Sequence, residues 1–189
     1  AVMQWAQTHK RSMKEVVSTA MSLATMDEDT AESCMYALPR TRKVKDATTG
    51  RMIEVPIEGP SVRLAEIVAY SFPNAIVGAR VIDDDGKFLT AQGVFIDAER
   101  NIRYSIEVKR RVTNKDGVRY SDDMVGVTAN AACAIAYRNV VFKAIPRALV
   151  NKVYGAARQV AVGTVETLAQ KRQAMLTYFA KMHVSEAQV

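Results

Sequence analysis

Two clusters of aspartates are the groups in this sequence best suited to catalysis. Asp83, Asp84 and Asp85 are consecutive, and Asp122 and Asp123 are adjacent. Carboxylates grouped in this way can hold Mg²⁺, as in metal-dependent nucleases. The first cluster is equally typical of a tight turn between strands, and the second lies where acids stabilise the start of a helix. Both interpretations stay open on the sequence alone.

Other catalytic signatures are missing from the sequence. It contains no GxxxxGK[ST] phosphate loop, no GxSxG elbow and no HExxH motif. The only histidines, His9 and His183, lie near opposite ends in polar, helix-like sequence. Cys34 and Cys133 lack CxxC spacing, which favours reduced, buried thiols in a reducing compartment. We therefore predict a protein that is not an enzyme and that holds no metal or other cofactor.

Positive charge is the stronger lead. The chain carries 26 Lys and Arg against 20 Asp and Glu, for a net charge of +6, yet no acid occurs from Met124 to Val165. The basic residues of that stretch are Arg138, Lys143, Arg147, Lys152 and Arg158. They have no carboxylate three or four residues away to pair with along a helix. If the chain bends only slightly at Pro146, one helical stripe contains Lys143, Arg147, Asn151, Tyr154 and Arg158.

Two further segments are basic. One is the predicted outer face of a strand at 101–113, with Arg103, Lys109 and Arg111. The other is an exposed loop or ragged hairpin with Arg40, Arg42 and Lys43. These charges could simply keep the protein soluble, but three such segments favour a polyanion such as nucleic acid. Aromatic residues make up only 7% of the chain. A bound strand would therefore be held mainly by its phosphates, which leaves base edges free for pairing.

The apolar pattern predicts the elements that position these charges. Residues 1–38 read as helix, interrupted by an acidic cap at 26–32 and followed by a second short helix that ends near Leu38. The next expected elements are a helix within 58–74 and strands at 76–83, 87–97 and 101–113. A long helix should begin at about 122, and a last helix should cover 164–183. At Pro146 the long helix is either kinked or followed by a second helix from Arg147 to about 160.

We predict an α+β fold: a three-stranded antiparallel meander followed by a long helix, a β-β-β-α core, with helical N- and C-terminal extensions. One domain should cover residues 1–189. Its expected parts are a helical N-terminal extension (1–38), a basic loop (39–58), an α-β-β-β-α core (59–160) and a C-terminal helix (161–189). No apolar run approaches the roughly 20 residues of a membrane span, and the first residues do not form a secretion signal.

This element order resembles a known group of proteins, and two strings resemble an uncharacterised phage family that is loosely associated with the same role. They are "ESCMYALPR" (32–40) and "IEGPSVRLAEIVAYSFPNAIVGARVI" (57–82). The chain resembles, over roughly residues 32–160, the single-strand annealing proteins of phage recombination, the RecT/Redβ type. The resemblance implies a β-β-β-α unit that lines a positively charged groove. It also implies subunits that assemble into rings or filaments, and a cytoplasmic location in a bacterial host.

By this resemblance the groove lies between the sheet and the helix at 124–158. The candidate DNA contacts are Arg63, Arg103, Lys109, Arg111, Arg138, Lys143, Arg147, Arg158, Arg40, Arg42 and Lys43. We expect a single-stranded DNA-binding protein that promotes ATP-independent annealing of complementary strands in homologous recombination. Its expected partners are single-stranded DNA, further copies of itself, and a phage exonuclease or single-strand-binding protein. The alternatives are a metal-dependent nuclease built on the aspartates and an adaptor whose basic surface meets an acidic protein.

Overall fold

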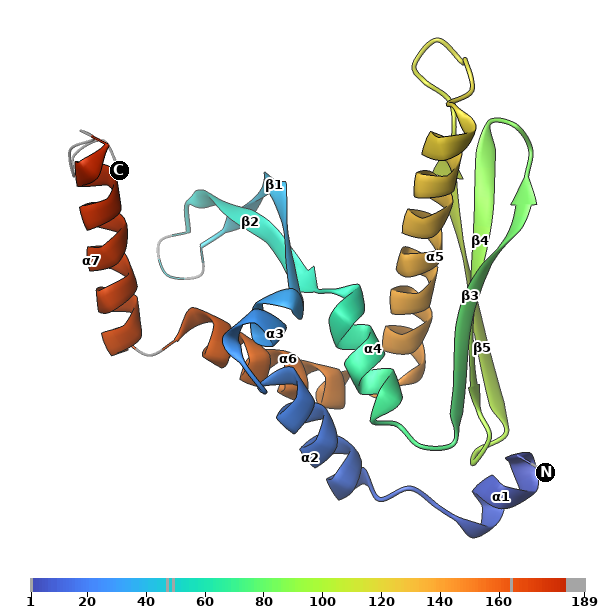
Figure 1. Ribbon diagram of the computed structural model, residues 1–189. Helices are drawn as coiled ribbons and strands as arrows, with labels where there is room; N and C mark the ends of the chain where they lie inside the picture. The colour runs from blue at the N-terminus through green and yellow to red at the C-terminus, as the bar shows by residue number, and fades with distance from the viewer. Residues whose placement is uncertain (1, 47, 49, 164, 183–189) are drawn as a thin grey trace.

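A computed structural model describes residues 2–46, 48, 50–163 and 165–182 and has the predicted α+β architecture (Figure 1). In chain order, the elements are α1 (Val2–Thr8), α2 (Met13–Ala24), α3 (Glu28–Ser33), β1 (Met35–Lys45), β2 (Met52–Pro60), α4 (Val62–Tyr70), β3 (Ala75–Asp84), β4 (Phe88–Asp97), β5 (Ile102–Arg111), α5 (Asp122–Ala144), α6 (Arg147–Val162) and α7 (Val165–Lys181). Within the described residues, the predicted meander and the long helix after it are confirmed.

The three-stranded sheet has the antiparallel order β3-β4-β5. Phe95 of β4 pairs with Val77 on one side and Tyr104 on the other. Alternation along each strand sends these three side chains toward α5 and the intervening ones to the opposite face. Its strand bounds agree with the predicted ones to within two residues, because alternating apolar and polar residues are a strong local signal.

Helix α5 lies directly on one face of the sheet (Figure 1). Small residues allow this close approach: Ala132 and Ala136 are fully buried against Leu89 and Ala91. At the point of closest approach β4 has Gly93, where a Cβ atom would collide with the carbonyl oxygen of Ala136. The helix and the sheet are therefore in contact along their backbones.

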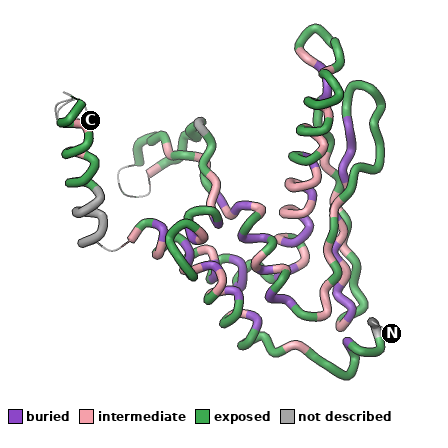
Figure 2. Tube along the Cα trace, viewed as in Figure 1, coloured by how far each residue is buried: buried purple, intermediate pink, exposed green. Residues whose placement is uncertain are grey.

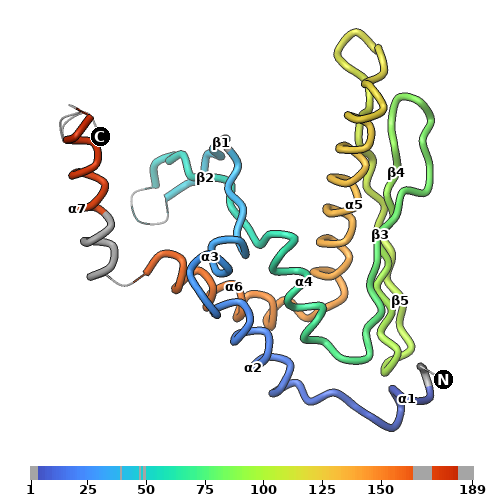
Figure 3. Tube along the Cα trace, in the orientation of Figure 1, coloured from blue at the N-terminus to red at the C-terminus, as the bar shows by residue number. Residues whose placement is uncertain are grey.

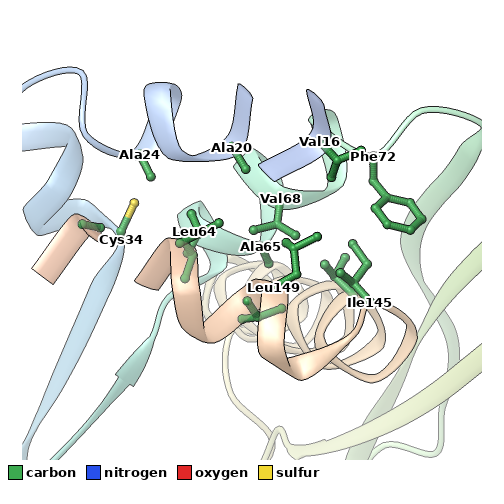
Figure 4. Packing of buried hydrophobic residues seen from close by; sticks show 14 of the residues in the cluster. Val16, Ala20, Ala24, Cys34, Leu64, Ala65, Val68, Phe72, Ile145 and Leu149 are labelled. Atoms are coloured by element: carbon green, nitrogen blue, oxygen red, sulfur yellow. The ribbon is translucent and has the colours of Figure 1, made fainter. Parts of the chain in front are cut away.

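The larger part of the core lies among the helices beside the sheet (Figure 4). Helices α2 and α4 pack with α6 there, and their buried side chains include Val16, Leu64, Val68 and Leu149. Ser61 caps α4, because its hydroxyl accepts hydrogen bonds from the amides of Arg63 and Leu64.

The segment 39–58, predicted as a basic loop with a ragged hairpin over 39–51 as the alternative, belongs to a two-stranded antiparallel hairpin, β1 with β2. The predicted short helix to Leu38 is also wrong, because α3 ends at Ser33 and β1 begins at Met35. Both faces of the hairpin are largely exposed, as the green trace in Figure 2 shows. Apolar and polar residues do alternate along β2 from Ile53 to Glu58, but the basic residues of β1 show no such period.

Pro146 separates two helices that run in clearly different directions (Figure 3). Helix α5 ends at Ala144, Ile145 is extended, and α6 begins at Arg147 immediately after the proline. Proline has no amide hydrogen and clashes with the preceding turn of a helix, so it suits the start of a new one. The mild kink on which the single basic stripe depended is therefore wrong, and the alternative of a second helix is confirmed.

The N-terminal segment is fastened to the end of the sheet by Arg11, which lies between α1 and α2. Its side chain is only 4% exposed and forms ion pairs with Asp97 and Glu99. The guanidinium also lies 4.0 Å from the ring centroid of Phe72. We call this group the Arg11 clasp; it joins the helical part of the fold to the β4–β5 end of the sheet.

Helix α7 stands apart from the rest of the chain (Figures 1 and 2). Among its described side chains, Tyr178 is 61% exposed and Met175 is 43% exposed. The predicted end of the final helix at 183, with His183, and the remainder of the predicted C-terminal part lie outside the described residues.

Within the described part of the chain, α5 is the one helix long and apolar enough to cross a membrane by length and composition. A single helix of this kind indicates little, because core helices of folded domains have the same composition. In this fold Ala132, Ala136 and Val140 of α5 are fully buried, and the helix covers the sheet.

Candidate nucleic-acid interface

The predicted groove between the sheet and α5 does not form. The helix is seated on the sheet at Gly93, so no strand could pass between them. Arg103, Lys109 and Arg111 alternate with the β5 side chains that face α5, and they therefore lie on the opposite face of the sheet. The predicted contacts belong to at least two separate surfaces rather than to one groove.

One surface is concave and lies in the angle between the hairpin, the end of α5 and the start of α6. We call it the elbow pocket; it has a volume of about 460 Å³. Its polar lining residues are Arg42, Glu58, Arg147 and Asn151, its rings are Phe142 and Tyr154, and its remaining walls are Gly59, Pro60 and Val150. The turn at Pro146 creates this pocket, because it directs α6 away from the sheet and beneath the hairpin.

Two predicted cations, Arg42 from β1 and Arg147 from α6, meet in the elbow pocket. Both are exposed, and among the described residues neither forms an ion pair with a carboxylate. The first turn of α6 contains no acidic residue and has no side-chain cap. The positive end of the helix dipole therefore adds to the charge of the two arginines at this place.

Arg138 approaches the hairpin from α5. Its guanidinium lies 5.3 Å from the centroid of the Tyr36 ring on β1 and donates to the side-chain oxygen of Asn139 at 3.1 Å. Gly59 lies opposite Tyr36, and a Cβ atom at position 59 would be 3.0 Å from the tyrosine oxygen. Gly59 therefore leaves room for the Tyr36 ring, which would have to shift slightly to accept a Cβ atom at position 59.

Arg158 is already neutralised within the chain. It forms an ion pair with Glu58 at 2.9 Å, and both side chains are about half exposed. The prediction that the α6 cations have no internal partner is therefore wrong for Arg158. Glu58 also lines the elbow pocket, where burial and this carboxylate raise the pKa of Tyr154 while Arg158 opposes them. The Tyr154 hydroxyl is one of the buried polar side-chain atoms without a hydrogen-bond partner in the described structure.

The second surface is the face of the sheet opposite α5, which we call the open sheet face. It carries Arg80, Arg103, Lys109 and Arg111. A shallow pocket of about 330 Å³ lies between Arg80 and Arg103 over Ile76, Gly78 and Val94. Arg80 was missed from the sequence, although its alternation with Val77 and Ala79 on β3 could have placed it beside Arg103.

The remaining predicted contacts are dispersed. Arg63 of α4 pairs with Glu66 at 2.8 Å and is 64% exposed, away from the elbow pocket. Lys143 is exposed in the last turn of α5, where a cation complements the helix dipole. Arg40 and Lys43 are exposed on β1, and Lys43 is paired in register with Glu54 on β2.

The two aspartate clusters meet at the far end of the sheet, with Arg119 between them. The Arg119 guanidinium donates to Asp84 at 2.6 Å and also interacts with Asp122. Hydrogen bonds from Arg119 and from the Gly86 amide lower the pKa of Asp84 to about 2. Asp85 accepts hydrogen bonds from the amides of Lys87 and Phe88 in the turn. In the described residues, His, Cys, Asp and Glu side chains do not gather into a group of three or more that could hold a metal ion.

Comparison with known proteins finds no family model, no curated protein and no solved structure that matches this chain.

Proposed function

We propose that this protein binds single-stranded DNA and promotes annealing of complementary strands without ATP. The elbow pocket carries the proposal, because Arg42 and Arg147 meet there without carboxylate partners among the described residues. Phosphates on a bound strand supply the missing negative charge. No bond is made or broken in this reaction; the protein lowers the repulsion between two strands, and base pairing drives the product.

The strand crosses the angle between the hairpin and α6, and Arg138 and Lys143 on α5 extend the positive surface beside it. The open sheet face, with Arg103, Lys109 and Arg111, is a second candidate for phosphate contacts. This division replaces the single groove that the resemblance to phage annealing proteins implied. The annealing role, action in recombination and a cytoplasmic location remain proposals that this resemblance supports.

Assembly of several copies completes the proposal, since a strand longer than one protomer needs a continuous path. Support comes from α7, which stands apart from the body with Met175 and Tyr178 exposed. Contact between α7 and a neighbouring copy would bury these side chains and join protomers into rings or filaments. A phage exonuclease and a single-strand-binding protein remain further candidate partners.

The salt dependence of binding tests the function. For single strands, log K falls by about 0.7 per neutralised phosphate with log salt concentration, so three contacts per protomer give a slope of about −2. We expect this slope in fluorescence anisotropy with a labelled oligonucleotide, and faster pairing of fluorophore- and quencher-labelled complementary strands without nucleotide. A flat salt profile, or an unchanged pairing rate, would overturn the proposal. Binding to acidic proteins alone would favour the adaptor.

A further inference from the structure

We propose that the elbow pocket takes up one nucleotide of the bound strand with its base turned out of the stack. This inference rests on the proposed function and adds a base-binding site to it. The first observation is shape. A phosphate grip needs only cations on an open surface, whereas this pocket is a concavity of about 460 Å³, within the range of sites that enclose small organic ligands.

The lining has the chemistry of a nucleotide rather than of a phosphate alone. Phe142 from α5 and Tyr154 from α6 are half-buried and supply aromatic surface. A base can pack on such rings whatever its identity, because each base has a π-face. Asn151 is exposed in the first turns of α6 and offers an amide donor and acceptor, the pair of groups that base edges match.

The charges at the same site fit the rest of a nucleotide. Arg42 and Arg147 come from opposite walls and can bind the flanking phosphates. Glu58 also lines the pocket, but its ion pair with Arg158 at 2.9 Å offsets its negative charge. Gly59 and Pro60 have small side chains on the hairpin side of the pocket, which leaves space there for the ring of a base.

A base in the pocket cannot pair with the complementary strand. Each protomer therefore withholds one base and presents the nucleotides between two pockets for pairing. The spacing of neighbouring pockets fixes the length of these runs, so strand presentation becomes periodic.

Abasic DNA separates this inference from the proposed function. The probes are an oligothymidylate and a tetrahydrofuran abasic strand of the same length, which carry the same number of phosphates. We expect the abasic strand to bind about 5-fold to 100-fold more weakly, with the same salt slope, because stacking of a base on an aromatic side chain is of that size. Equal affinity for the two strands overturns the nucleotide pocket and leaves the phosphate grip intact. Failure of both strands to bind overturns the proposed function.

Variants locate the effect. Phe142→Leu should lower oligothymidylate affinity toward that of the abasic strand and leave abasic binding unchanged. Tyr70→Leu is the matched control, because Tyr70 is 79% exposed on α4 and does not line the pocket. Since Phe142 packs against the core, Asn151→Ala at an exposed position provides a second variant that should not affect folding. If neither variant reduces the difference in affinity between oligothymidylate and the abasic strand, no base binds in the elbow pocket and the inference is wrong.

Discussion

Gly93 of β4 and Ala136 of α5 lie backbone against backbone, so closely that a single methyl group at position 93 would collide with the Ala136 carbonyl oxygen. This contact seals the inner face of the sheet along the middle of α5. A polyanion would therefore have to use exposed surfaces of the molecule, of which the elbow pocket and the open sheet face each carry at least two predicted cations.

Gly93→Ala should destabilise the fold. The added methyl group forces the helix away from the sheet, and overpacking of this kind costs about 1–3 kcal/mol. Gly78→Ala on β3 is the matched control, because a Cβ atom there meets nothing within 4 Å. Urea denaturation should show a lower midpoint for Gly93→Ala only. Equal midpoints for the two variants would contradict the close approach of α5 and the sheet.

Reversing charge in the elbow pocket should weaken strand binding more than reversing charge on the open sheet face. For Arg42→Glu with Arg147→Glu we expect at least about a tenfold loss of affinity, and a salt slope smaller by about 0.7 for each lost contact. The comparison is Arg103→Glu with Lys109→Glu, and anisotropy titrations of both double variants over the same series of salt concentrations give the affinities and slopes. Circular dichroism checks that both double variants fold. If only Arg103→Glu with Lys109→Glu lost affinity, the bound strand would lie on the open sheet face instead of at the elbow pocket.

Loss of Arg11 should be strongly destabilising. Arg11→Met removes the counter-ion of Asp97 and leaves a carboxylate that is 9% exposed without a charged partner. Removal of one partner from a buried ion pair costs about 3–5 kcal/mol. The free energy of unfolding from urea titration measures this loss. Arg63→Met is the control, because its ion pair with Glu66 is largely exposed and contributes little.

The Arg11 clasp also predicts acid sensitivity. Burial alone would raise the pKa of Asp97, but hydrogen bonds from Arg11 and from the Arg100 amide hold it below its ordinary value of 3.8. A carboxyl with a lowered folded-state pKa stabilises the fold above its unfolded pKa, and this contribution is lost as pH falls through the folded value. Stability should therefore decrease as the pH falls below about 5, through the ordinary value of 3.8 and on through the lower folded-state pKa. In Arg11→Met, burial dominates and raises the pKa of Asp97. The loss of folding stability at low pH should therefore become smaller or change sign.

Labelled single-stranded and duplex DNA should stay full length when incubated with the protein and Mg²⁺. Asp84 is paired with Arg119 and Asp85 caps the turn amides, so these carboxylates already have partners. Shortened product on a denaturing gel would favour the nuclease instead. If product appeared, its loss in Asp84→Asn would assign cleavage to this cluster.

Assembly should depend on α7. Met175→Glu with Tyr178→Glu places charges at exposed apolar positions of the helix, where they oppose burial against another copy. We expect a smaller sedimentation coefficient and fewer rings or filaments in electron micrographs with single-stranded DNA. Gln173→Glu on the same helix is the control. Unchanged assembly in the double variant would show that copies meet through another surface.

Local patterns predicted the sheet well and the hairpin badly. The alternation from Ile102 to Val108 records a strand with one buried face, and Pro73 with Asn74 marks the end of a helix. Strand β1 has exposed charges on both of its faces, so its sequence shows no clear period, and the alternation from Ile53 to Glu58 in β2 was not recognised as a strand. Apolar residues between Cys34 and Leu38 then suggested a helix.

The candidate site could be predicted only in part, because it depends on the direction of α6. The basic residues of 124–165 could be recognised as candidate phosphate contacts, because that segment contains no acid. Arg42 and Arg147 meet only because the chain turns at Pro146, and no local pattern gives the angle of that turn. The ion pairs of Arg158 with Glu58 and of Arg11 with Asp97 join residues far apart in the sequence, so no local pattern predicts them.

The Arg11 clasp borders the bend at Pro146, because Arg11, Asp97 and Pro146 line one cavity. Its ion pairs join the segment before α2 to the end of β4 in the sheet. The opening between the hairpin and α6 is thereby set partly by a residue that does not line it. A variant that kept every lining side chain of the elbow pocket but lost the Arg11 ion pairs would have the same chemical groups, and the angle between the hairpin and α6 would no longer be fixed.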